Sequence, residues 1–240
     1  MTYCVGLLLK AGLVLLSDTR TNAGLDNIST YRKMFTFEKA GDRAIAMMTA
    51  GNLSVTQTTL ARLTEAIDAP EATPETSIML AENMLDVASI VGDMLSKVTA
   101  ETKARMDRMN QMAGASMLVA GQRKGGRMRL FLIYPEGNFI EATEDTPYLQ
   151  IGEHKYGKPI LDRVITADTP LEEARKAALL SMDSTLRSNL SVGMPLDLVI
   201  IETDSLRISE QRRIEPNDEE FAAMSAAWSQ ALRDAFAQID

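Results

Sequence analysis

A threonine stands second in the chain, directly after the initiator methionine. If Met1 is removed, Thr2 carries a hydroxyl nucleophile and a free α-amine on one residue. An α-amine has a pKa of about 7.7–8.0, so a useful fraction is neutral near pH 7 and can take the hydroxyl proton. Thr2 therefore predicts N-terminal-nucleophile chemistry, with nucleophile and base on one residue. A processed terminus without a catalytic role is the alternative interpretation.

The single histidine and the single cysteine restrict the other chemistries. His154 alone excludes multi-histidine zinc sites, and between Glu153 and Lys155 we expect it to be a solvated or packing residue. Cys4 alone excludes an internal disulfide framework and any multi-thiolate metal site. Because Cys4 lies in an expected strand, we expect a buried apolar side chain and not the nucleophile. The chemistry at Thr2 needs no metal or cofactor, and we expect none.

Three further segments follow Thr2 in a distinctive order. Residues 17–24 read Ser-Asp-Thr-Arg-Thr-Asn-Ala-Gly, and Lys33 lies in Arg-Lys-Met at the start of an expected strand. Residues 48–52 read Met-Thr-Ala-Gly-Asn, where an expected strand meets an expected helix. With the opening Thr-Tyr-Cys-Val-Gly-Leu, these segments resemble the β-subunits of proteasomes, most closely the bacterial ancestral β-subunit (Anbu) branch. The resemblance covers essentially the whole chain, and its specific motifs lie within residues 1–52.

The resemblance implies a role for each matching residue. Thr2 would be the nucleophile, and its α-amine would be the general base. Lys33 would place a positive charge beside the Thr2 hydroxyl, and Asp18 would keep Lys33 charged and oriented. The Gly51 backbone N–H, at the start of a helix, would form the oxyanion hole, where one donor is worth about 2.7–4 kcal/mol. Backbone groups of Asn22 and Gly51 would align an extended peptide substrate by strand addition.

Two later segments depart from the family's pattern. Family members usually place a serine in a glycine-rich turn near the active site, and this chain has Glu153 there, in Ile-Gly-Glu-His. We assign Glu153 to the substrate-binding group; it would raise the pKa of the Thr2 amine, serve as a base or alter the specificity. On the supporting loop, Ser191 matches the family's serine and is assigned to the catalytic group, whereas Ser188 stands where the family has an aspartate.

The sequence therefore predicts a threonine-type endopeptidase that hydrolyses peptide bonds through an acyl-enzyme on Thr2. The resemblance implies a homo-oligomer, as a ring or as an open-ring or helical assembly, with peptides or unfolded proteins as substrates. No Gly-x-x-x-x-Gly-Lys-Ser/Thr loop is present, so an ATP-dependent unfoldase would be a separate chain. Two alternatives stay open: a non-catalytic structural subunit of such an assembly, and an N-terminal-nucleophile amidase on a small molecule. The pairing of Lys33 with Asp18 favours the peptidase.

The composition is that of an ordinary globular protein and excludes several partners. The 240 residues include 25 Lys and Arg against 33 Asp and Glu, for a net charge of -8. This acidic balance argues against nucleic-acid binding, which needs a basic face. No signal peptide is recognisable, and no stretch approaches the roughly 20 apolar residues that span a bilayer. We therefore expect a cytoplasmic protein without a membrane partner.

Hydrophobic periodicity places these candidate residues on grouped strands and grouped helices. We expect strands at 3–10, 13–17, 33–38, 43–49, 116–122, 128–134, 138–141, 148–151, 196–203 and 206–214. We expect helices at 54–67, 75–108, 158–166, 171–189 and 217–238, with a polar loop at 19–29 and Thr169 capping the fourth helix ahead of Pro170. This order favours antiparallel sheets covered by helices. The expected fold is α+β, a four-layer αββα sandwich formed as one domain over residues 1–240.

Overall fold

The computed structural model describes residues 1–22, 28–106 and 114–239. The strands are β1 (Tyr3–Leu9), β2 (Gly12–Asp18), β3 (Arg20–Asn22), β4 (Ile28–Thr30), β5 (Met34–Lys39), β6 (Arg43–Gly51), β7 (Ala115–Arg123), β8 (Arg129–Ile133), β9 (Phe139–Glu141), β10 (Tyr148–Gly152), β11 (Leu196–Glu202) and β12 (Glu210–Ile214). The helices are α1 (Leu53–Asp68), α2 (Met84–Met106), α3 (Lys158–Val164), α4 (Leu171–Ser188) and α5 (Glu219–Ala237).

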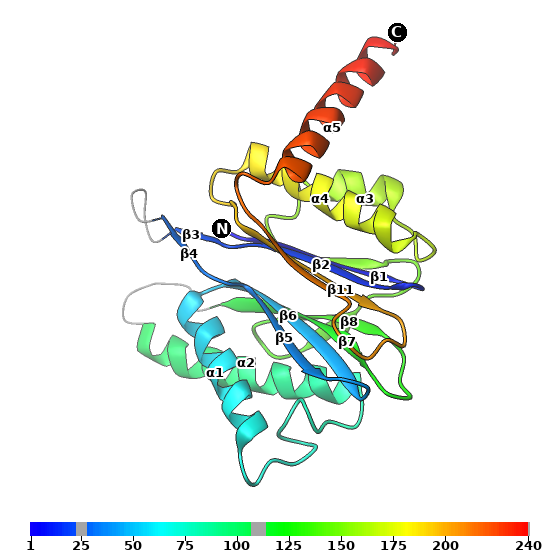
Figure 1. Ribbon diagram of the computed structural model, residues 1–240. Coiled ribbons are helices and arrows are strands. Elements are labelled where there is room, and N and C mark those ends of the chain that lie inside the picture. The colour runs from blue at the N-terminus through cyan, green and yellow to red at the C-terminus, as the bar shows by residue number, and fades with distance from the viewer. Residues whose placement is uncertain (23–27, 107–113, 240) are drawn as a thin grey trace.

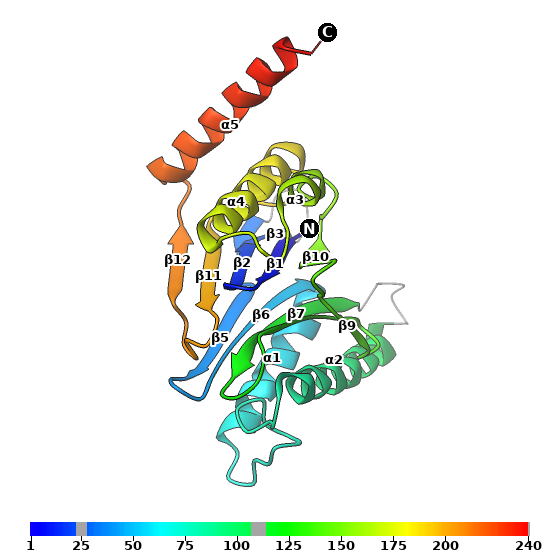
Figure 2. The same ribbon diagram turned by 90° about the vertical axis from the view of Figure 1, so that its right-hand side faces the viewer.

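Two antiparallel sheets face each other between two helical layers (Figure 1). The first sheet has the order β10–β1–β2–β11–β12, and the second has the order β5–β6–β7–β8–β9. Helices α3 and α4 cover the first sheet, and α1 and α2 cover the second (Figures 1 and 2). The expected four-layer αββα sandwich is confirmed, and β3 pairs with β4 in a separate two-stranded ribbon.

The central strands are apolar on both faces because each sheet is covered on both sides. All seven residues of β2 are buried. Successive side chains of a strand point to opposite faces: Val14 and Leu16 pack with the helices, whereas Leu13 and Leu15 pack between the two sheets. The resulting cores hold both sheets rigidly, so the loops at one edge of the sandwich have a fixed frame.

The helix expected at 75–108 begins later than predicted. Instead of accepting helical hydrogen bonds, the carbonyls of Ile78 and Ala81 accept from the buried guanidinium of Arg43, at 3.2 and 2.9 Å. Asn83 then caps α2, because its Oδ1 accepts from backbone N–H groups of the first turn. The predicted end of this helix at residue 108 lies outside the described residues.

Three shorter assignments also differ from the prediction. The expected loop at 19–29 contains β3 and β4, although residues 23–27 lie outside the described part. The strand expected at 206–214 starts only with β12, because Asp204 and Leu206 have positive φ angles of 62° and 50° and form a turn. Pro170, not Thr169, is the N-cap of α4, and the Thr169 hydroxyl accepts instead from the backbone N–H of Thr166.

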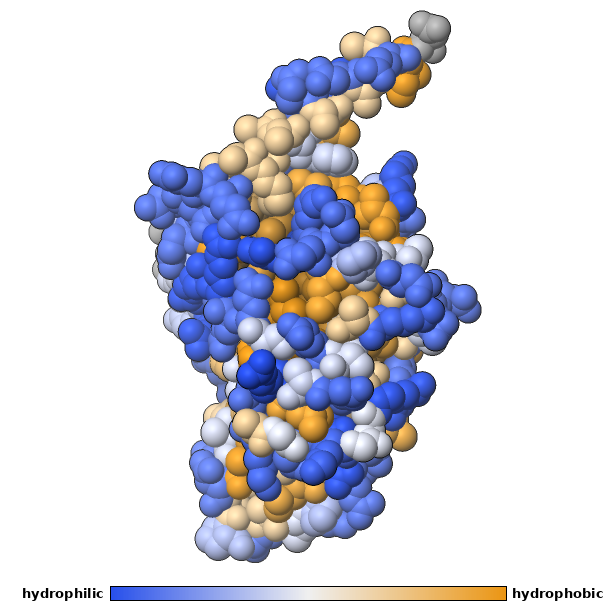
Figure 3. All heavy atoms as spheres, turned by 45° about the vertical axis from the view of Figure 1, so that its right-hand side comes forward, coloured by the Kyte–Doolittle hydropathy of each residue, from blue (hydrophilic) through white to orange (hydrophobic). Residues whose placement is uncertain are grey.

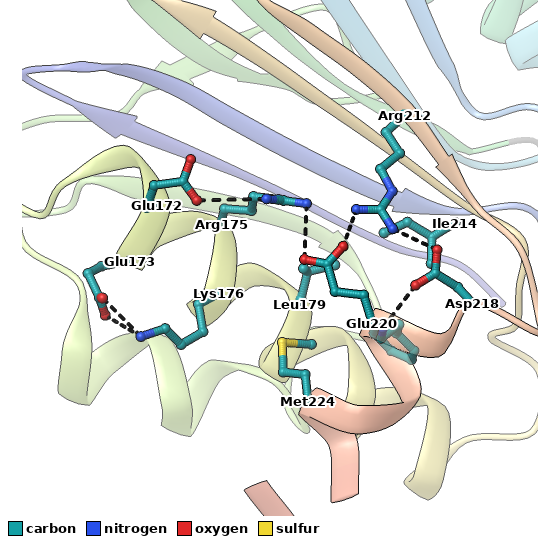
Figure 4. A pocket seen from close by; sticks show the side chains of 11 residues that line it. Glu172, Glu173, Arg175, Lys176, Leu179, Arg212, Ile214, Asp218, Glu220 and Met224 are labelled. Carbon is teal, nitrogen blue, oxygen red and sulfur yellow. Dashed lines mark hydrogen bonds and ion pairs between the residues drawn. The ribbon is translucent and has the colours of Figure 1, made fainter. Parts of the chain in front are cut away.

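Helix α5 leaves the body of the molecule and projects away from it (Figures 1 and 2). Among its residues only Phe221 and Ser225 are buried. Arg212 on β12 fixes the root of the helix by ion pairs with Asp218 at 2.7 Å and Glu220 at 2.5 Å (Figure 4). Hydrophobic residues gather on the surface below the projecting helix (Figure 3). The root of α5 is therefore anchored by charge and capping, while the rest stands free of its own chain.

The close approach of α2 to the turn between β8 and β9 yields a test of packing. A Cβ on Gly92 would lie 2.2 Å from the carbonyl oxygen of Gly137. Replacing a glycine by alanine inside a helix usually stabilises by about 1 kcal/mol, but overpacking costs about 1–3 kcal/mol. We expect Gly92→Ala to lower the free energy of unfolding by up to about 2 kcal/mol, the difference between these two contributions, measured by urea denaturation at one protein concentration. Ser89→Ala, on the exposed face of α2, should change it by less than about 0.5 kcal/mol; a stabilised Gly92→Ala variant would contradict the contact.

Candidate active site

A cavity of about 320 Å³ opens at one edge of the sandwich, beside the start of β1. Its wall includes four residues that the sequence predicts for the site: Thr2, Lys33, Gly51 and Glu153. Thr2 comes from the start of the first sheet, whereas Gly51 ends β6 of the second sheet. The cavity therefore lies where the two sheets meet, and both sheets position its groups.

Strand register brings Asp18 next to the nucleophile candidate. Strand β1 pairs with β2 so that Cys4 lies opposite Ser17, which leaves Asp18 beside the beginning of β1. The Asp18 carboxylate accepts backbone N–H groups from Tyr3 at 3.1 Å and from Gly193 at 3.2 Å. The Asp18 side chain is thus tied to the residue that follows Thr2 and to the loop after α4.

Lys33 and Asp18 form a buried ion pair. Lys33 Nζ donates to Asp18 Oδ1 at 2.7 Å and to the carbonyl oxygen of Arg20 at 2.7 Å. Only 6% of the Lys33 side chain and none of the Asp18 side chain is exposed. Burial raises the pKa of the Asp18 carboxyl, and the Lys33 ammonium and the backbone N–H groups oppose that rise. The pair places a fixed positive charge in the wall of the cavity that Thr2 shares.

The backbone of Thr2 is held from the side of β10. The Thr2 carbonyl accepts from the backbone N–H of Glu153 at 2.7 Å. A Cβ on Gly152 would lie 1.9 Å from that carbonyl oxygen, and the φ of Gly152 is +83°, which favours glycine. Only a glycine fits between Thr2 and the turn, so the Ile-Gly-Glu-His segment brings Glu153 against Thr2.

Gly51 lies where β6 gives way to α1. Asn52 is the N-cap of α1, and its Oδ1 accepts a hydrogen bond from the Val55 N–H at 3.2 Å. The first turn of α1 carries no acidic residue, so the positive end of its dipole is not neutralised locally. Leu53 and Thr56 of this turn line the cavity together with Gly51. The cavity therefore combines backbone N–H groups with a helix N-terminus, an arrangement that suits developing negative charge.

Glu153 connects the cavity to the loop that follows α4. Its carboxylate accepts from Asn189 Nδ2 at 2.9 Å, and Asn189 Oδ1 accepts from the Ser191 backbone N–H at 2.9 Å. Ser191 is not among the residues that line the cavity, and it is linked to the cavity through Asn189. The sequence did not single out Asn189, although it lies within the loop segment that the family resemblance marked.

The remaining predicted residues lie around this centre. Asn22 ends β3, and its neighbour Thr21 lines the cavity. Thr49, two residues before Gly51 in β6, also lines the cavity. Cys4 is fully buried, and burial raises the pKa of its thiol. His154 is exposed and borders an adjacent cavity of about 370 Å³.

The lining residues that sequence reasoning missed carried a weak signal. Thr21 and Thr49 lie inside the two motifs that carry the resemblance, but nothing in the one-dimensional sequence distinguishes a side chain at the cavity from one beside it. Leu53 and Thr56 have the i, i+3 spacing of one helix face. Their position at the start of α1 becomes significant only once the helix is known to begin at the cavity.

The described residues contain no group of three or more His, Cys, Asp or Glu side chains that could hold a metal ion. Nor does any helix in the described ranges have the length and apolar character needed to cross a membrane.

A second groove lies at the root of α5 (Figure 4). Its charged side chains, such as Arg212 and Asp218, form ion pairs with one another, so this groove differs from the cavity at Thr2.

A family profile described as proteasome subunit matches residues 2–201. The chain belongs to the proteasome family. Solved structures agree with this assignment: Anbu (ancestral beta-subunit) from Yersinia bercovieri is 45% identical with a TM-score of 0.92, and the match covers 99% of this chain and 97% of that chain. No curated protein sequence matches the chain.

Two further structures are similar to this proteasome-family chain. An Anbu (Gly-1) mutant from Hyphomicrobium sp. strain MC1 is 48% identical with a TM-score of 0.92, covering 100% of this chain and 98% of that one. The helical assembly of the Anbu complex from Pseudomonas aeruginosa is 46% identical with a TM-score of 0.93, covering 99% of this chain and 97% of that one. The resemblance to the Anbu branch is thereby confirmed over nearly the whole chain.

The buried ion pair makes a prediction about stability. In Asp18→Asn the Lys33 ammonium keeps only the Arg20 carbonyl as a strong acceptor, and breaking a buried pair in this way costs about 3–5 kcal/mol. We expect urea denaturation to show a loss of that size. Lys33→Met should cost less, because the Asp18 carboxyl can take up a proton and keep its backbone donors. The double variant should recover most of the loss, and strictly additive effects would contradict a coupled pair.

Proposed function

We propose that this proteasome-family chain is a threonine endopeptidase whose nucleophile is Thr2 after removal of Met1. The observation that carries the proposal is the buried Lys33–Asp18 pair in the wall of the cavity that Thr2 lines. A fixed cation beside a hydroxyl favours the alkoxide character that nucleophilic attack requires. The proposed unit extends over residues 1–240 and acts in the cytoplasm as a subunit of a homo-oligomer.

In the proposed reaction the Thr2 oxygen attacks the carbonyl carbon of the scissile peptide bond. The α-amine of Thr2 takes the hydroxyl proton, and the Gly51 N–H and the α1 N-terminus stabilise the oxyanion. Collapse of the tetrahedral intermediate breaks the C–N bond, and the proton passes to the leaving amine. Water then hydrolyses the ester on Thr2, which restores the hydroxyl and releases the carboxylate product. Lys33 stays protonated throughout and stabilises negative charge on the Thr2 oxygen.

The substrate contacts follow from the walls of the cavity. An extended peptide would run between the Thr21 side, at the end of β3, and the Gly51 side, at the end of β6, with its backbone bonded to both edges. The roles of Asn22 and Glu153 toward substrate, and that of Ser191 as a supporting residue, stay predictions. Thr21, Thr49 and Thr56 form part of the cavity wall between these two edges.

Homo-oligomerisation is supported by similarity and by surface chemistry. The Anbu complex of Pseudomonas aeruginosa is described as a helical assembly. In this chain, α5 exposes Leu232 and Phe236, with 51% and 81% of each residue accessible. Apolar surface of this kind on a projecting helix is unfavourable in water and favours contact with another copy. A separate ATP-dependent unfoldase remains a further expectation for such an assembly.

A second candidate, a non-catalytic structural subunit, applies if the chain retains Met1. Met1 itself lines the cavity, and in a chain that retains Met1 the α-amine belongs to that residue. Thr2 would then lack its general base. Removal of Met1 therefore decides between the two candidates.

The first test is the intact mass of the protein after incubation with a peptidyl epoxyketone. This reagent closes a ring that requires a hydroxyl and a free α-amine on one residue, so we expect an adduct on a chain that lacks Met1. Thr2→Ser should also react, whereas Thr2→Ala should not. A chain that retains Met1 and forms no adduct would favour the structural subunit. An unmodified chain that begins with Thr2 would contradict the proposed nucleophile for that class of peptide.

The second test addresses the cation. We expect Lys33→Ala to reduce hydrolysis of a fluorogenic peptide by about 10²–10³-fold or more, the loss that follows removal of one charge-stabilising group. Circular dichroism should show a folded protein, because the Asp18 carboxyl can be neutralised by a proton. Lys176→Ala, at an exposed lysine on α4 outside the cavity lining, is the control and should retain turnover. Equal turnover in Lys33→Ala and the parent would overturn the mechanism.

A further inference from the structure

We propose that Glu153 is a positioning residue for the α-amine of Thr2. Its carboxylate accepts a hydrogen bond from the amine that removal of Met1 exposes, and it keeps that amine protonated to a higher pH than an ordinary α-amine. The inference rests on the proposed function, since Thr2 must be the first residue. It adds a pH threshold to that function, because a protonated amine cannot accept the Thr2 hydroxyl proton.

The backbone geometry places Glu153 directly against Thr2. Its N–H donates to the Thr2 carbonyl at 2.7 Å, and Gly152 fits closely enough that a Cβ there would meet the same oxygen. Both residues line one cavity, and only 14% of the Glu153 side chain is exposed. A carboxylate removed from water to this extent requires hydrogen-bond donors nearby.

The contacts of the Glu153 carboxylate leave room for one more donor. Asn189 Nδ2 donates to Oε2 at 2.9 Å, and the mostly exposed ammonium of Lys155 is 3.9 Å from the same oxygen. Asn189 is itself fixed, because its Oδ1 accepts from the Ser191 N–H. Within the described part of the chain, both partners contact Oε2 of Glu153, so Oε1 can accept a hydrogen bond from the α-amine of Thr2. The carboxylate is therefore held in place before the amine exists.

The charges around Thr2 set the direction of the effect. The Lys33 ammonium lines the cavity and opposes protonation of the amine, but its bonded partner Asp18 offsets part of its field. The Arg20 guanidinium donates to the Leu190 carbonyl, outside the cavity lining. The first turn of α1 adds no acidic group, and Lys155 and His154 are exposed, so solvent screens them.

Glu153 is therefore the one carboxylate among the described residues that line the cavity with Thr2. A carboxylate within about 4–6 Å favours the ammonium form and raises its pKa by about 1–3 pH units. An α-amine with its ordinary pKa of about 7.7–8.0 is neutral in roughly a tenth to a sixth of the molecules at pH 7, and a rise of one pH unit or more would reduce that fraction about tenfold or more. Turnover should accordingly rise with pH through this raised pKa, where the amine becomes neutral and can act as the base.

The experiment measures the amine directly and does not need peptidase activity. The full chain beginning with Thr2 is prepared by cleaving a removable N-terminal tag. Trace acetic anhydride is added over a range of pH, and mass spectrometry quantifies acetylation of the N-terminal fragment, which reports the neutral amine. We expect an apparent pKa above 8 in the parent and a decrease by about one pH unit or more in Glu153→Gln.

Two variants serve as controls. Glu172→Gln removes an exposed carboxylate on α4 and should leave the pKa of the amine unchanged. Lys155→Gln removes the cation beside Glu153 and should move the pKa slightly upward, opposite to Glu153→Gln. Asn189→Ala frees the carboxylate from its fixed position and should give a smaller decrease than Glu153→Gln. It also tests the proposal if Glu153→Gln loses its folded circular dichroism spectrum.

The outcomes separate this inference from the proposed function. Equal pKa values for the amine in the parent, Glu153→Gln and Asn189→Ala would overturn the inference, whatever the peptidase activity. A lowered pKa in Glu153→Gln without peptide hydrolysis by any variant would support the inference and contradict the peptidase. With hydrolysis present, the pH–rate profile of Glu153→Gln should shift to lower pH by the same amount as the pKa of the amine.

Discussion

The buried ion pair between Lys33 and Asp18 is the constraint on which the candidate site depends. Two charges without access to water are tolerated only when donors and acceptors surround them, and here those groups come from separate parts of the chain. The Asp18 carboxylate binds backbone N–H groups at the start of β1 and in the loop after α4. Lys33 reaches the carbonyl of Arg20. The pair therefore fixes four segments around one charge, and the cavity takes its shape from them.

The cavity also has a charge asymmetry across Thr2. Lys33 directly precedes β5, in the second sheet, and Glu153 directly follows β10, in the first sheet. One group favours negative charge on the Thr2 oxygen, and the other favours positive charge on its amine. These preferences oppose each other in a residue whose amine must be neutral when its hydroxyl reacts. The balance between the two sides determines how readily such a residue can act as its own base.

Much of this architecture could be predicted from the sequence, because the strands in the centre are long apolar runs and Thr2, Asp18 and Lys33 lie in recognisable motifs. Elements and site residues that depend on a single contact distant in the sequence could not be predicted. The segment before α2 has helical periodicity, but the Arg43 guanidinium, distant in the sequence, donates hydrogen bonds to the carbonyls of Ile78 and Ala81. Asn189 was missed for the same reason, since its importance depends on Glu153, 36 residues earlier.

The hold on the Thr2 carbonyl has a consequence for maturation. The peptide unit after Thr2 is fixed twice: its carbonyl accepts from the turn after β10, and its N–H, which belongs to Tyr3, donates to Asp18. Thr2 therefore loses most of its backbone freedom when the sandwich folds, with Met1 still attached. Cleavage of one peptide bond would then change the charge and the bulk at this point without a new ordering cost. Maturation of such a chain is a local covalent event in a rigid frame, and its rate should depend on access to the Met1–Thr2 bond and not on refolding.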